Sequence, residues 1–191
     1  LRKRVSTELE SAFSISAVFS PTSKIVIVGQ APGRITHNKG IPFDDPSGDR
    51  LRSWLGIDRD LFYDDQKLAI VPMGFCFPGT GKGGDLPPRP ECPPAWRDRI
   101  LETLTSVDLT LVIGRFAIDW HLPDQSRRTV TDIVRDWEKL WPKMLVLPHP
   151  SPRNNRWLKQ NPWFDEEVIP ALQSKVGQLF DIGVVLLRTI A

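Results

Sequence analysis

The sequence predicts a three-layer α/β/α sandwich, in which helices cover both faces of a central four-stranded parallel sheet. Four short apolar runs have the length of buried strands, at residues 24–28, 68–71, 109–113 and 144–147. Segments with helical character separate these runs, and strands that alternate with helices are typical of a parallel sheet. Polar loops rich in glycine and proline follow several runs, and ligands bind at strand ends in this class of fold.

The composition favours one globular domain. The chain has 191 residues, 40% hydrophobic and 25% charged, which suits a single core. We expect one domain over 1–191, with a peripheral N-terminal segment at 1–23. The net charge is only +2, so any contact with nucleic acid must come from a local basic face. No apolar run has the length of a membrane span and no signal peptide is recognisable, so we expect a cytoplasmic monomer that binds no membrane.

The remaining elements follow from local signals along the chain. We expect helices over 5–13, 47–56, 93–104, 115–121, 129–140 and 165–179, the last kinked or interrupted by Pro170. Ser47 is a suitable N-cap residue, and Pro93 and Pro94 suit a first helical turn. Long loops are expected from Gly29 to Pro46 and from Pro72 to Gly84.

Two predicted strands end in loops that present polar groups. The run 24–28 is followed by Gly29-Gln30-Ala31-Pro32-Gly33, and the run 144–147, after Pro148, by His149-Pro150-Ser151-Pro152-Arg153-Asn154. Because the carboxyl ends of parallel strands meet at one edge of the sheet, we expect these loops to form the walls of one cleft.

These two loops resemble the signature loops of the uracil-DNA glycosylase superfamily. The segment Gly40-Ile41-Pro42-Phe43 is similar to the Gly-x-Pro-Phe stretch of the family 4 branch, and the match runs in order over residues 24–172. The resemblance implies a DNA glycosylase, which flips a base out of DNA, hydrolyses its N-glycosidic bond and leaves an abasic site. Neither loop contains a lysine, so we expect a monofunctional enzyme without a Schiff base.

The expected catalytic residues are His149 and Gln30. Cleavage leaves negative charge on the base, and the resemblance implies that His149 donates a hydrogen bond to a carbonyl oxygen of the base. Gln30 is expected to hold the attacking water, but its amide does not titrate. Ala31 stands where the most active branch has an aspartate, which predicts slower chemistry or a base elsewhere. Asp44 and Asp45 are the nearest carboxylates, and we favour capping and turn roles for them.

A further set of residues is expected to surround the base. They are Gly29, Ala31, Gly33, Phe43, Met73 and Gly74. The resemblance implies that Phe43 stacks on the flipped base. Gly33 replaces a tyrosine that blocks 5-substituents in uracil-specific enzymes, so the pocket is open to larger bases, although a glycine here also suits a tight turn. The base-reading asparagine of the family is replaced by Val71 or Pro72, so we expect backbone groups just after them to substitute.

The second signature loop is expected to grip DNA. Pro152 and Arg153 resemble the wedge that fills the hole left by the flipped nucleotide, and Ser151 should bind a neighbouring phosphate. Other residues expected along the DNA path are Asn154, Arg156, Lys159, Lys82, Arg89 and Arg97. For any one of these cations, an ordinary solvated charge is an equally good interpretation.

We expect no cofactor and no metal. The spacing of Cys76 and Cys92 resembles half of the iron–sulfur ligand set of the family 4 branch. Four thiolates hold such a cluster, and the sequence contains two cysteines.

Three functions remain open at this stage. The glycosylase substrate is uracil or a 5-modified pyrimidine, such as a hypermodified cytosine of phage DNA. The alternative is a catalytically inactive module that binds DNA or lesions, which Ala31 makes plausible. A nucleotide-binding protein is disfavoured, because Gly81-Lys82-Gly83 is not a Walker-type ending.

Overall fold

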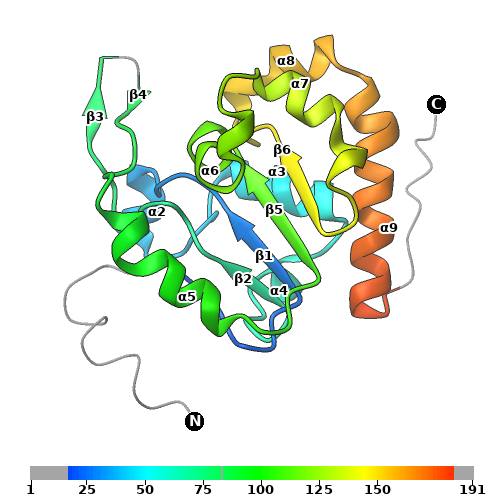
Figure 1. Ribbon diagram of the computed structural model, residues 1–191, viewed down its shortest axis with the longest axis horizontal. Helices are drawn as coiled ribbons and strands as arrows, with labels where there is room; N and C mark the ends of the chain where they lie inside the picture. The colour runs from blue at the N-terminus through cyan, green and yellow to red at the C-terminus, as the bar shows by residue number, and fades with distance from the viewer. Residues whose placement is uncertain (1–16, 83, 183–191) are drawn as a thin grey trace.

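The computed structural model describes residues 17–82 and 84–182 and has the predicted three layers (Figure 1). The sheet consists of β1 (Ile25–Val28), β2 (Leu68–Ile70), β5 (Leu109–Ile113) and β6 (Met144–Leu147), all parallel, in the order β2-β1-β5-β6. The four predicted strands are therefore confirmed. The helix expected over 5–13 lies outside the described residues.

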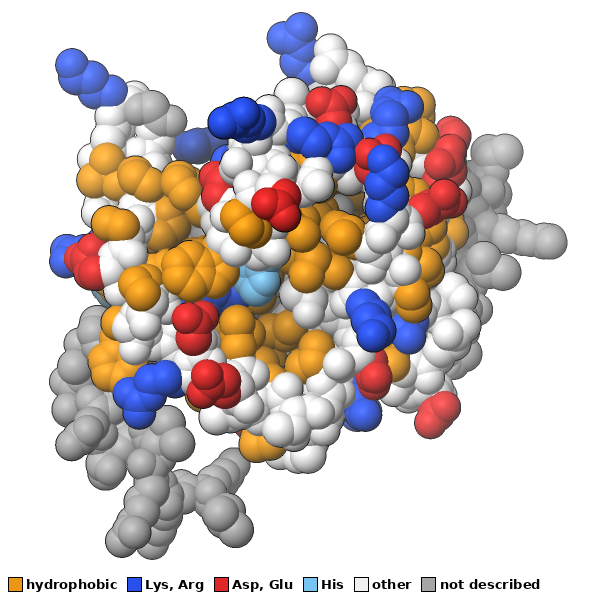
Figure 2. Space-filling model, viewed as in Figure 1, with side chains coloured by type: hydrophobic (Ala, Val, Ile, Leu, Met, Phe, Trp, Pro, Cys, Tyr) orange, Lys and Arg blue, Asp and Glu red, His pale blue; other side chains and the backbone are white. Residues whose placement is uncertain are grey.

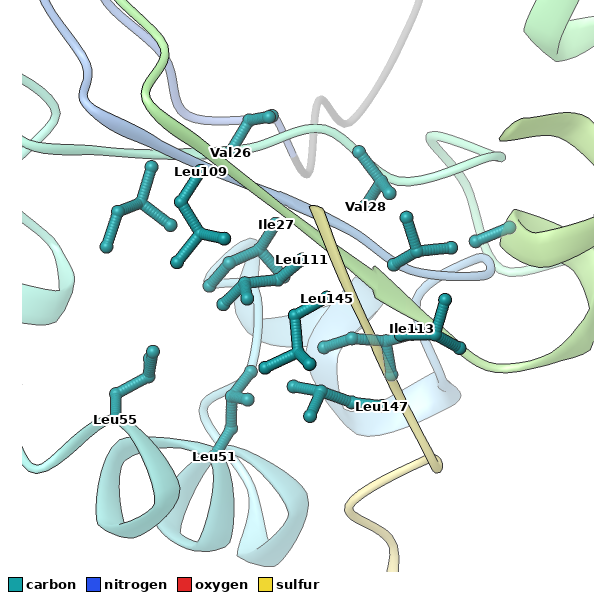
Figure 3. Close-up of a cluster of buried hydrophobic side chains, with 14 of the residues drawn as sticks. Val26, Ile27, Val28, Leu51, Leu55, Leu109, Leu111, Ile113, Leu145 and Leu147 are labelled. Atoms are coloured by element: carbon teal, nitrogen blue, oxygen red, sulfur yellow. The ribbon is translucent and has the colours of Figure 1, made fainter. Parts of the chain in front are cut away.

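The pairing register places larger side chains on one face of the sheet and smaller ones on the other. Ile27, Leu111 and Leu145 are neighbours in register on three adjacent strands, so their side chains share one face. They point toward Leu51 and Leu55 of α3 (Pro46–Leu55), as Figure 3 shows. The opposite face of the same strands carries mainly valine, alanine and threonine. Burial on both faces explains why the strands are nearly continuous apolar runs.

Helices cover the sheet on both sides. In the view of Figure 1, α5 (Asp98–Thr103) and α6 (Arg115–His121) lie in front of the sheet and α3 behind it. The long C-terminal helix α9 (Ile169–Phe180) packs against α3, and α7 (Val130–Arg135) packs against β6. No helix in residues 17–82 or 84–182 is long and apolar enough to cross a membrane.

Three predicted helices differ in detail. A π-helical turn at Pro93–Arg97 precedes α5, and another at Phe164–Val168 precedes α9. Pro170 is the second residue of α9, directly after the second π-helical turn, so the hydrogen-bond pattern of the predicted helix changes just before the proline. The helix expected over 129–140 is α7 followed by a 3₁₀ turn at Trp137–Lys139.

Several short elements lie where loops or no element were expected. They are α2 (Arg34–Lys39), α4 (Arg59–Phe62), α8 (Asn155–Gln160) and the antiparallel hairpin of β3 (Thr80–Gly81) and β4 (Gly84–Asp85). Helix α2 buries only Thr36 and has no side-chain N-cap, so it lacks both apolar periodicity and a start signal. Helix α4, in contrast, starts at an N-cap, since the Asp58 side chain accepts from the Leu61 N–H at 2.8 Å.

Leu51 tests the packing of α3 against the sheet. We expect Leu51→Ala to lower the free energy of unfolding by about 2–5 kcal/mol, because it leaves a cavity beneath three strands. Chemical denaturation measures the loss. Ser53→Ala, on the exposed side of the same helix, is the control and should change stability by less than about 0.5 kcal/mol. Equal effects of both substitutions would contradict the packing described.

Candidate active site

A cavity of about 430 Å³ opens where the parallel strands end. Its lining contains the whole loop Gly29–Gly33, which follows β1, and four residues of the loop that follows β6. His149, Gln30 and Phe43, which are far apart in sequence, thus face one space. The volume lies within the range of about 300–1,000 Å³ that is usual for small-ligand pockets. The structure therefore brings the two predicted loops together around one candidate site.

The imidazole of His149 is half-buried and packs against the backbone of Gly114, which follows β5. The Ser151 N–H donates to its Nδ1 at 3.2 Å, so the neutral ring carries its proton on Nε2. Burial lowers the pKa of His149; nearby Asp45 raises it, and Arg153 lowers it further. The net shift is downward, so at neutral pH this residue is an uncharged imidazole with one N–H donor.

Phe43 has an unusual backbone conformation. Its φ is +57°, in the left-handed region that bulky residues rarely adopt. The Arg52 Nη1 donates to the Phe43 carbonyl at 3.3 Å, and a Cβ added at Gly48 would lie only 1.7 Å from the same oxygen. The ring lies near Gly29, with Cζ 3.7 Å from where a Cβ would stand there. The start of α3 therefore holds a strained aromatic residue in the cavity wall.

The two carboxylates after Phe43 have different surroundings. Asp45 is the N-cap of α3 and accepts from the Gly48 N–H at 2.9 Å, which confirms its predicted capping role. It also lines the cavity. Asp44 pairs instead with Lys39 at 2.9 Å and Arg59 at 2.7 Å, and their hydrogen bonds lower the pKa of Asp44. Of these two carboxylates, only Asp45 lines the cavity.

The base-binding role expected for Met73 and Gly74 stays a prediction. The Met73 N–H is already bonded to the carbonyls of Gly29 at 2.8 Å and Gln30 at 3.0 Å, and the residue is buried. Gly74 packs behind Ala31, and neither residue lines the cavity. Pro72 does line it, but offers no hydrogen-bond donor. These backbone groups support the first loop and do not face the cavity.

Arg97 does not face DNA either. Its side chain is fully buried, its Nη1 donates to the Val71 carbonyl at 2.8 Å, and its Nη2 contacts His121 Nε2. Burial lowers the pKa of Arg97 to about 10. The sequence contains a signal for this burial. Arg97 lies three residues before Ile100 and seven before Leu104, so helical spacing places it on the same apolar face. The residue braces the end of β2 next to the cavity.

The other predicted cations are exposed. Arg153 also lines the cavity, and its Nη1 lies 2.7 Å from where a Cβ would stand at Gly84. The remaining ones are Lys82, Arg89, Arg156 and Lys159. In the view of Figure 2, Lys and Arg side chains lie near the β3–β4 hairpin and over α7 and α8, with acidic side chains among them. The basic groups are thus dispersed over this face of the molecule.

Arg50 was not predicted from the sequence, but it positions the loop that carries His149. Arg50 of α3 donates to the carbonyls of Pro150 at 3.2 Å and Ser151 at 3.1 Å, and to the Asn155 Oδ1 at 2.7 Å. Asn154 Nδ2 donates to the His149 carbonyl at 2.7 Å. These bonds fix the loop that carries the imidazole.

The cysteines lie away from the cavity lining. Both are free thiols, and burial, with a smaller contribution from Cys76, raises the pKa of Cys92. Within the described ranges 17–82 and 84–182, no group of three or more His, Cys, Asp or Glu side chains is arranged to hold a metal ion. The expectation that the chain binds no iron–sulfur cluster rests on the cysteine count and stays a prediction.

The fold and the cavity define an α/β protein with its ligand site at the carboxyl edge of a parallel sheet. The family pattern described as the uracil DNA glycosylase superfamily matches residues 17–173, and the chain belongs to this superfamily. The structure resembles the solution NMR structure of "a putative Uracil DNA glycosylase" from Methanosarcina acetivorans. That match has a TM-score of 0.52 and 16% identity, and covers 84% of this chain and 96% of the other. The predicted superfamily is confirmed, and its members act on DNA; the family 4 branch stays a prediction.

Gly48 tests the close approach at Phe43. Because backbone atoms occupy the space for a Cβ, we expect Gly48→Ala to lower the free energy of unfolding by about 1–3 kcal/mol or more. Thermal unfolding measures it. Gly40→Ala is the control. Gly40 has φ +68°, but an added Cβ would meet nothing within 4 Å. This substitution should therefore cost only the backbone strain of about 1–2 kcal/mol. A Gly48 variant as stable as the natural protein would contradict the contact.

His121 makes stability depend on pH. Burial, with a smaller effect of Arg97, lowers the pKa of His121 from 6.5 to about 4, so the unfolded chain takes up this proton first. The contribution is therefore complete above pH 6.5 and is lost progressively as the pH falls toward 4. Denaturation curves across this window measure it. His121→Gln should flatten part of the slope, and an unchanged slope would contradict the assignment.

Proposed function

We propose that this protein is a monofunctional DNA glycosylase, which receives a base flipped out of DNA and hydrolyses its N-glycosidic bond. The observation that carries the proposal is that His149, Gln30 and Phe43 line one cavity at the strand ends. Membership of a superfamily of DNA glycosylases supports the reaction class. The product is an abasic site and a free base.

The chemistry needs a donor for the base and stabilisation for the sugar. As the C–N bond breaks, the electron pair goes to the base, and the His149 Nε2–H donates to the carbonyl oxygen on which the charge gathers. The Asp45 carboxylate stabilises the positive character of the sugar. Gln30 orients the water that attacks the sugar carbon, and this water releases its proton to solvent as the C–O bond forms. Because His149 is neutral, the departing base takes its proton from solvent.

DNA binding uses the second loop. Extruding a base costs a few kcal/mol of unstacking, and Arg153 with Pro152 compensates by filling the vacated space. The Ser151 hydroxyl binds a phosphate beside the target. Arg156 and Lys82, both exposed, contribute less specific phosphate contacts. With a net charge of only +2, these local contacts must supply the electrostatic part of binding.

Two substrates are consistent with the cavity. Uracil is supported by the superfamily alone. A 5-modified pyrimidine is supported by Gly33 and Pro72 in the lining, since neither blocks a substituent with an aromatic side chain or reads the base with an amide. A hypermodified cytosine of phage DNA belongs to this second class.

A DNA-binding module without catalysis is the second candidate. Ala31 lines the cavity at the position where the most active branch has its aspartate, so this wall offers no titratable group. Such a protein would bind duplexes with an altered base and release no base. The experiment below separates the two candidates.

Excision from a duplex panel tests the proposal. The duplexes carry uracil, thymine mispairs and 5-substituted cytosines, and alkali cleavage detects abasic sites. We expect His149→Ala to lower the single-turnover rate by about 10²- to 10³-fold, while duplex affinity is kept.

His37→Ala is the matched control. This second half-buried histidine accepts from the Phe77 N–H outside the cavity lining, so its loss should leave excision largely unchanged. Binding of the panel with no cleavage by the natural protein would favour the inactive module. Equal losses in the two variants would exclude a direct role of His149.

A further inference from the structure

Asp85 is exposed to solvent, and its carboxylate is one that the proposed chemistry does not use. It belongs to β4 of the short hairpin and lines the cavity. Its Oδ2 lies 3.4 Å from where a Cβ would stand at Gly33, so the carboxylate covers the small residue of the first loop. Within residues 17–82 and 84–182, no hydrogen bond or ion pair involves this carboxylate.

The hairpin fixes the position of the Asp85 backbone. Asp85 pairs with Thr80 across the two strands, and the Thr80 hydroxyl accepts from the Arg34 Nη2 at 2.8 Å. The Leu86 N–H donates to the Gly79 carbonyl at 2.9 Å and closes the hairpin. Arg34 comes from α2, directly after the first loop, so hairpin and loop are tied together. The approach of Asp85 to Gly33 is therefore built into the site.

A free carboxylate beside a DNA pocket has an electrostatic cost. DNA phosphates repel the carboxylate. A base that enters the cavity also displaces water from the carboxylate. The lost hydrogen bonds are replaced only if the base supplies a donor. An ionised carboxylate only accepts hydrogen bonds, so it favours a hydroxyl, an amine or an ammonium group. A methyl substituent on the base in this place would leave the Asp85 carboxylate without a hydrogen-bond partner.

We propose that Asp85 is a specificity-determining residue, which selects pyrimidines whose ring substituent carries a hydrogen-bond donor. This inference rests on the proposed base-excision function and names its substrate class, of which 5-hydroxymethyl and 5-aminomethyl pyrimidines are the simplest members. Gly33 leaves the room that such a substituent needs. Arg153 is the competing partner, because its guanidinium lies over Gly84, next to Asp85.

The test compares two bases that differ in one hydroxyl. Duplexes carry 5-hydroxymethyluracil or thymine opposite guanine, and both single-turnover excision and duplex affinity are measured. We expect the natural protein to prefer the hydroxymethyl base by about 10- to 100-fold, as a hydrogen bond to a charged group implies. Asp85→Ala should abolish the preference, and Asp85→Asn, which keeps an acceptor oxygen, should retain part of it. Asp60→Ala, an exposed carboxylate on α4, is the control and should retain all of it.

The outcomes separate this inference from the glycosylase proposal. Excision without a preference, unchanged in Asp85→Ala, overturns the inference and leaves the glycosylase intact. A binding preference that depends on Asp85, with no excision, supports the inference and overturns the glycosylase. Equal losses for both bases in Asp85→Ala show that Asp85 positions Arg153, and overturn base selection. If the natural protein shows no excision and no preferential binding, both proposals are overturned.

Discussion

The close approach of α3 to the Phe43 backbone is the constraint on which the site depends. Gly48 leaves no space between the helix and the Phe43 carbonyl, and the Arg52 guanidinium bonds that carbonyl while lying over the ring of Phe62 at 5.3 Å. The Phe62 ring meets that of Phe43 edge-on, with centroids 6.2 Å apart. A positive φ at a phenylalanine persists only where its surroundings determine it completely. One wall of the cavity is thus set by packing outside the cavity.

The same helix organises the opposite wall. Arg50 binds two carbonyls of the loop after β6, and Asp45, which caps the helix, lies near enough to His149 to raise the pKa of its imidazole. Leu51, on the inner side of α3, is fully buried beneath the sheet. Core packing and site geometry therefore share one element, so a shift of α3 would displace the aromatic wall and the imidazole loop together.

The charges of the cavity have distinct tasks. His149 is neutral through burial, so its Nε2–H is a hydrogen-bond donor that carries no permanent positive charge. Asp45 accepts a hydrogen bond from the Gly48 N–H with one oxygen and also lines the cavity. Asp85 has no partner in the described part of the chain, and Arg153 lies next to it across Gly84. A neutral donor, His149, and one carboxylate, Asp45, are suited to a leaving group that becomes negative and a sugar that becomes positive.

The sequence by itself determined the parallel sheet, because strands buried on both faces are continuous apolar runs, and it determined the two loops that follow β1 and β6. It also placed Phe43 and His149 in recognisable motifs. Only the tertiary structure decided which backbone groups face the cavity, since the Met73 N–H is bonded to Gly29, a contact that no periodicity reveals. Arg97 was misread for a related reason: a charged residue looks exposed until the element that buries it is in place. The pairs Gly48–Phe43 and Asp85–Gly33 likewise arise from helix and hairpin placement, and local sequence carries no signal for such contacts.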